Sequence, residues 1–107
     1  MAIILDTLLA QLRNHQWLYR MCYQINQDTN EGVLTLDLGS DENCSEHLQI
    51  EFQGISYFSC SGIEGRTQLP FIIVEDISDR QWEDKRYSVW EDEHDKVKFL
   101  CRDITLI

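Results

Sequence analysis

The chain has no lysine or arginine between Met21 and Gly65, although nine such residues occur in its 107 positions. Eight acidic residues lie in that stretch, and the whole chain has a formal net charge of -10. A surface with this charge repels phosphate backbones and anionic lipid headgroups. The sequence therefore predicts that the protein binds neither nucleic acid nor membranes directly.

Closely spaced cysteine pairs are also missing. The four cysteines are Cys22, Cys44, Cys60 and Cys101, and no two of them form a CxxC motif. Structural zinc is usually held by such pairs, and disulfides are expected mainly in secreted chains. We therefore expect reduced thiols, mostly buried, and the sequence predicts no metal and no cofactor.

No apolar run approaches the roughly 18–20 residues that a membrane span requires. The apolar run at residues 2–5 is too short for a signal peptide, has no basic residue before it, and is followed by Asp6. These features predict a cytoplasmic protein. The length predicts one α+β domain over residues 1–107.

No catalytic constellation stands out. A thiol and an imidazole from Cys60 and either His47 or His94 could form a nucleophile and its base, but only the tertiary structure brings such groups together. The segment 91–95 combines four carboxylates and an imidazole. Neighbouring residues of a hairpin point to alternate faces, so these groups do not all converge. A solvated loop is favoured over a metal site, and enzymatic activity is not favoured.

Helical periodicity in residues 2–14 predicts an amphipathic helix, in which leucines recur every three or four residues. Asn14 and His15 are suited to end it, and His15 is expected on the surface. A capping box beginning at Ser78 predicts a short helix or single turn up to about Lys85, with Trp82 packed on the sheet or serving as an interaction anchor.

Alternation of apolar and polar residues predicts several strands. Residues 48–58 form the central one, where Gly54 is either a hairpin turn or, as we favour, a bulge in one long strand. Residues 33–38 should direct Leu34, Leu36 and Leu38 inward. In the segment 17–26, the expected inward set is Trp17, Tyr19, Met21, Tyr23 and Ile25.

The last 20 residues predict a hairpin with its loop at 93–95. In that register Val89 faces Phe99 and Tyr87 faces Cys101, with Glu91 on the same inward side, while Trp90 faces Lys98 on the other. The parity of apolar residues then changes, which indicates a bulge near Arg102 and Asp103.

Together these elements predict an α+β fold in which an N-terminal helix covers a twisted antiparallel sheet of about six or seven strands, twisted enough to curl toward a barrel, with a short helix before the final hairpin. The residues carry no family motif. Small acidic inhibitor and immunity proteins are similar in size and charge only.

The leading functional hypothesis is a non-enzymatic interaction module, either an inhibitor or immunity-like protein or an assembly subunit, that binds a protein with a basic surface. The candidate partner-binding residues are Asp41, Glu42, Glu46, Glu91, Asp92, Glu93, Asp95 and Trp82. The alternative is a small-ligand-binding protein or minor enzyme with a pocket between helix and sheet, lined by Trp17, Tyr19, Tyr57 or Trp82. The sequence does not predict an oligomeric state.

Overall fold

The computed structural model describes residues 5–41, 43, 46–63, 67–69, 72–80, 85–93 and 96–107. Its elements, in chain order, are α1 (Leu5–Asn14), β1 (Trp17–Asn26), β2 (Glu31–Gly39), β3 (His47–Cys60), β4 (Thr67–Gln68), β5 (Ile72–Asp76), a 3-10 turn (Ser78–Arg80), β6 (Tyr87–Glu91), β7 (Val97–Cys101) and β8 (Asp103–Leu106).

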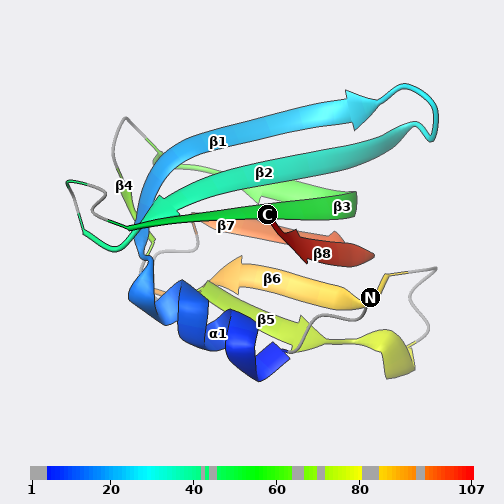
Figure 1. Cartoon of the computed structure of the whole chain (residues 1–107). Coiled ribbons are helices and arrows are strands. Elements are labelled where there is room, and N and C mark those ends of the chain that lie inside the picture. Colours follow the sequence, from blue (N-terminus) through cyan, green and yellow to red (C-terminus); the bar gives the residue numbers. More distant parts are fainter. Residues whose placement is uncertain are drawn as a thin grey trace.

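All eight strands belong to one antiparallel sheet, and α1 lies beside β5 (Figure 1). The strand order is β4-β1-β2-β3-β7-β6-β5, with β8 paired to β3 off this path. The α+β class and the N-terminal helix are therefore confirmed. Closure toward a barrel is wrong, because β4 and β5 end the sheet without pairing to each other among the described strands.

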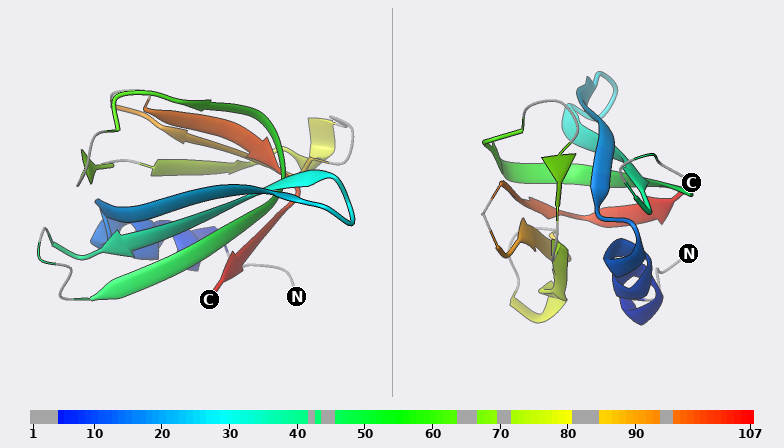
Figure 2. Two further views of the ribbon diagram at one scale, coloured as in Figure 1. Left: turned by 90° about the horizontal axis from the view of Figure 1, so that it is seen from above. Right: turned by 90° about the vertical axis from the view of Figure 1, so that its left-hand side faces the viewer.

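The long strand β3 joins the two halves of the sheet. Its first part pairs with β2 on one edge and β8 on the other, and its last residues pair with β7. Figure 2 shows the consequence: β1, β2 and the start of β3 form one layer, and β5, β6 and β7 form a second layer folded over it. This bend brings residues from distant parts of the chain around one core.

Gly54 lies at the bend, with a φ of 69°. Since β3 continues through it and its pairing shifts register, Gly54 marks a bulge and not a hairpin turn. An added Cβ at Gly54 would lie 2.9 Å from the Cβ of Arg102. Arg102 lies between the end of β7 and the start of β8, where the sequence predicts that the alternation of apolar residues changes. The amide of Arg102 donates a hydrogen bond to the carbonyl of Gln53 at 2.9 Å.

The core contains the side chains predicted from helix and strand periodicity. Leu8 and Leu12 of α1 are buried, and Leu34, Leu36 and Leu38 of β2 are each at most 2% exposed. Aromatic rings connect the two layers: Phe52 of β3 meets Phe99 of β7 edge to face, with 5.0 Å between ring centroids. The helix predicted over residues 2–14 is confirmed from Leu5 to Asn14, and its first three residues lie outside the described part of the chain. The predicted inward face of β2 is also confirmed.

His15 was predicted on the surface, and this is wrong. Its side chain is only 6% exposed. The ring nitrogen Nδ1 lies 2.8 Å from the carbonyl oxygen of Gln11, which is one of the last carbonyls of α1. The imidazole therefore ends the helix by a hydrogen bond inside the fold.

The predicted inward face of β1 is wrong in its first part. The pairing of β1 with β2 shifts between Leu18 and Arg20, so Tyr19 is an extra residue in the ladder. Leu18 is buried in place of its neighbours, and Tyr19 is 44% exposed. Beyond the shift Tyr23 does lie on the inner side, where its ring meets that of Phe58 at a tilt, with 4.8 Å between centroids. The Tyr23 residue nevertheless stays 42% exposed, because β1 is near the edge of the sheet.

The C-terminal hairpin has the predicted register. Tyr87 pairs with Cys101, Val89 with Phe99, and Trp90 with Lys98. The predicted short helix before it is not shown. A 3-10 turn spans Ser78–Arg80, and Asp76 caps it by accepting from the Ser78 amide at 2.9 Å and the Ser78 hydroxyl at 2.6 Å. The remainder of that segment, including Trp82, lies outside the described residues.

Tyr57 has an unfavourable backbone conformation, and burial of its side chain does not compensate for the energetic cost. Its φ is 56° and its side chain is 77% exposed. Asparagine tolerates this conformation better than a bulky residue does, so we expect Tyr57→Asn to raise the free energy of unfolding by about 0.5–1 kcal/mol. Urea denaturation measures the change. Ser59→Asn, an exposed site in the same strand without a positive φ, should give no gain, and equal gains from both variants would contradict the explanation.

Candidate functional site

Two of the predicted acidic segments lie at the same end of the molecule. Asp41 lies just after β2 and Glu46 just before β3, and Asp92 and Glu93 follow β6. Figure 1 shows β2 and β6 terminating toward the same end of the molecule. Glu46, Asp92 and Glu93 are exposed, and Asp41 is half-buried. We call these residues the acidic end. Glu42, Asp95 and Trp82 lie outside the described residues.

Hydrogen bonds to backbone amides hold the connection from β2 to β3. The amide of Ser40 donates to the Glu46 carbonyl at 3.0 Å, and the Ser40 hydroxyl accepts from the Glu46 amide at 3.2 Å. A carboxylate oxygen of Asp41 accepts from the Asn43 amide at 3.0 Å. The acids are thus presented on turns with defined geometry.

Glu91 does not belong to this exposed set, although it was predicted to be part of the partner-binding surface. It is 1% exposed and faces the core beside Tyr87 and Val89. Its carboxylate accepts from the amide of Glu93 at 2.5 Å and so stabilises the turn that presents Asp92 and Glu93. The hairpin register contained this signal, because it placed Glu91 on the inward side.

A groove lies on the outer face of the first layer, over β2. Val33 and Thr35 have short side chains that point outward from β2. Each is paired with a residue that has a longer side chain: Val33 with Gln24 of β1, and Thr35 with Glu51 of β3. The resulting groove has a volume of about 250 Å³ and is lined by Gln24, Ile25, Asn26, Val33, Thr35 and Glu51. Sequence reasoning missed it, although outward short residues between long ones were a readable signal.

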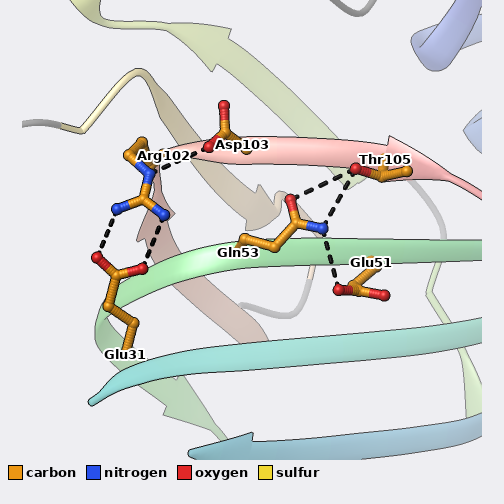
Figure 3. A network of polar contacts seen from close by, with 6 residues as sticks. All are labelled: Glu31, Glu51, Gln53, Arg102, Asp103 and Thr105. Carbon is orange, nitrogen blue, oxygen red and sulfur yellow. Dashed lines mark hydrogen bonds and ion pairs between the residues drawn. The ribbon is translucent and has the colours of Figure 1, made fainter. Parts of the chain in front are cut away.

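A polar network borders the groove (Figure 3). Gln53 donates through Nε2 to Glu51 at 3.0 Å and to the Thr105 hydroxyl at 3.2 Å. Arg102 makes a two-pronged ion pair with Glu31, one contact of which is 2.7 Å long, and also contacts Asp103 at 3.1 Å. These contacts join β2, β3 and β8 at the bend.

The two arginines that form ion pairs on the outer face of the first layer already have acidic partners. Arg20 lies 3.7 Å from Asp37, and Arg102 is held by Glu31 and Asp103. Within the described part of the chain, no lysine or arginine pairs with Glu51. The groove therefore carries a negative charge, that of Glu51, which none of the lysines and arginines described by the structure neutralises.

Cys60, the thiol considered as a possible nucleophile, lies beside a methionine. The Cys60 sulfur lies 3.9 Å from the sulfur of Met21, and burial raises the pKa of the thiol. A raised pKa disfavours the thiolate, which is the reactive form. His47 contacts the ring of Tyr19, with 6.1 Å between centroids, and His94 lies outside the described residues.

Of the aromatic residues proposed to line a ligand pocket, Trp82 lies outside the described residues and Trp17 is half-buried at the start of β1. Tyr19 and Tyr57 are 44% and 77% exposed, whereas leucines of α1 pack against the core. No described helix has the length and apolar character needed to cross a membrane.

Comparison with known proteins adds one finding. A protein-family model described as immunity protein PIM8 matches residues 5–106, which is nearly the whole fold. Searches of curated proteins and of solved structures found no match. The match includes both acidic connections and the grooved face, and it covers far more than half of the 107 residues. The chain therefore belongs to the immunity protein PIM8 family.

Proposed function

We propose that the chain neutralises a toxin protein by binding it, without catalysis, through negatively charged surface. The family supports a protein-interaction role of the immunity type. The observation that carries the proposal is that Asp41 and Glu46, near the end of β2, and Asp92 and Glu93, after β6, lie toward one end of a molecule whose net charge is -10.

The negative charge of this surface acts on the partner before the two proteins touch. A surface of one sign attracts a basic partner over distances of about 10 Å at moderate ionic strength, raises the association rate and orients the encounter. The partner that fits this mechanism is a toxin with a basic surface, and a small inhibitor is usually encoded beside its target. The product of the neighbouring gene is therefore the partner to test.

The first experiment is co-expression of the chain with that neighbouring toxin. If the proposal holds, cells that produce the toxin alone stop growing and cells that also produce the chain continue to grow. The purified pair should form a complex whose association slows steeply with added salt. Continued toxicity, or a complex indifferent to salt, would contradict the proposal.

Removing the charges of the acidic end gives a sharper prediction. The combined substitutions Asp41→Asn, Glu46→Gln, Asp92→Asn and Glu93→Gln keep the acceptor oxygens while removing four charges. We expect the association rate constant at low salt to fall by about 10–100-fold, because steering is lost. Stopped-flow kinetics at several salt concentrations would measure this, and the variant's rate should depend less on salt.

The matched control removes the same number of charges elsewhere, at the described residues Asp6, Asp28, Glu75 and Asp79. It should slow association far less, since these residues lie away from the acidic end. If the two variants slow association equally, only the net charge matters and the proposed surface is wrong.

A further inference from the structure

We infer that the groove over β2 receives a basic side chain, lysine or arginine, of the toxin, with Glu51 as the acceptor of its charge. This inference rests on the proposed function and names the contact that follows the encounter. It assigns a role to Glu51, which lies on β3 and not at the acidic end.

The shape of the groove suits a long, unbranched side chain. The floor is formed by Val33 and Thr35, both half-buried, and the exposed Ile25 lies at its border. The methylene groups of such a side chain can lie against Val33 while its charged end reaches the polar groups that make up most of the lining. The groove is thus mainly polar, with a small apolar surface beside its carboxylate.

The polar lining matches a cationic end group. Glu51 contributes a carboxylate and Gln24 a side-chain amide from β1, whereas the Asn26 side-chain oxygen already accepts from the amides of Asp28 and Thr29. Carboxylate and amide oxygens accept hydrogen bonds from ammonium and guanidinium groups, and a bond between two charged groups is stronger than a neutral one. Since Gln53 already donates one amide proton to Glu51 at 3.0 Å, the carboxylate is held in place before a partner arrives.

The charge of the surrounding face favours a cation over any other occupant. Arg20 and Arg102 are paired with acids of the same face, and Glu51 has no such cation among the described residues. An anionic group would meet the carboxylate of Glu51, and no lysine or arginine is among the residues that line the groove. A partner with a basic surface supplies the missing counter-charge.

The test compares binding of the neighbouring toxin to three forms of the chain by biolayer interferometry. Glu51→Gln removes the charge and keeps the size and the hydrogen-bonding oxygen, so folding should be unaffected. We expect about tenfold weaker binding or more, mostly through faster dissociation. Glu75→Gln, a half-buried acid on β5, removes one charge outside the groove and should bind within about twofold of the natural chain.

A second variant fills the groove from within. Thr35→Arg places a guanidinium next to Glu51, where it occupies the space and neutralises the charge, and we expect about 100-fold weaker binding. Circular dichroism and thermal denaturation check that both variants remain folded. In reverse, Glu51→Lys should recover binding to a toxin in which the contacting basic residue is changed to glutamate.

The outcomes separate the inference from the proposed function. If the natural chain does not bind the toxin, the proposed function is wrong and the inference falls with it. If the natural chain binds but Glu51→Gln and Thr35→Arg bind equally well, only the inference is wrong. If light scattering shows a dimer of the natural chain that either variant converts to a monomer, the occupant is a second copy, which also overturns the inference.

Discussion

Replacing Phe52 by alanine is expected to lower the free energy of unfolding by about 3–5 kcal/mol. The Phe52 side chain is fully buried in β3 and meets Phe99 of β7 edge to face. Truncation therefore removes apolar burial, leaves a cavity between the two layers, and loses a ring pair worth roughly 0.5–1.5 kcal/mol beyond its area. Chemical denaturation followed by tryptophan fluorescence would measure the loss.

Ile25→Ala provides the comparison, since Ile25 is 53% exposed on β1. It should cost less than about 1 kcal/mol. The double variant with Phe99→Ala should be less destabilised than the sum of the two single variants, because the ring pair is lost only once. Full additivity would mean that the two layers are not joined through this pair.

The substitution Gly54→Ala is expected to destabilise the fold by about 2–4 kcal/mol. The backbone at Gly54 has a φ of 69°, a region that disfavours any residue with a Cβ. The added Cβ would also lie 2.9 Å from the Cβ of Arg102, which is itself tied to Glu31. Thermal and urea denaturation should both show the effect.

Gly62→Ala isolates the two contributions. Gly62 has nearly the same φ, 68°, but an added Cβ there would have no neighbour within 4 Å. It should cost only about 1 kcal/mol, the backbone term alone. The excess loss at Gly54 then measures the packing of the β3 bend against Arg102, and equal losses at the two sites would show that this packing is unimportant.

Elements with an uninterrupted period were predictable. The leucines of α1 and β2 repeat without a break, and the last hairpin satisfies its pairs in only one register, so these parts of the fold were correctly predicted. The face of β1 was not, because an extra residue at Tyr19 reverses the alternation. An aromatic-rich strand looks the same in sequence whichever side its rings occupy.

Part of the candidate site was also predictable from the sequence, and part was not. Charge is a property of composition, so the acidic character of the proposed binding surface could be predicted from the lack of lysine and arginine between Met21 and Gly65. Burial of an individual side chain does not follow from composition. Glu91 lies in a highly charged segment, but its position in the hairpin directs its side chain into the core. The groove over β2 depends on side chains from three strands and appears only when those strands are in register.

The amino-acid sequence by itself determined the helix, the strands of regular period, the register of the last hairpin and the negative charge, because each depends on residues close together in the chain or on their sum. The tertiary structure decided which acids are exposed, where β3 bends and what surrounds Glu51. Those outcomes depend on the pairing of β3 with β2, β7 and β8, and contacts between residues so far apart in sequence leave no local pattern to read.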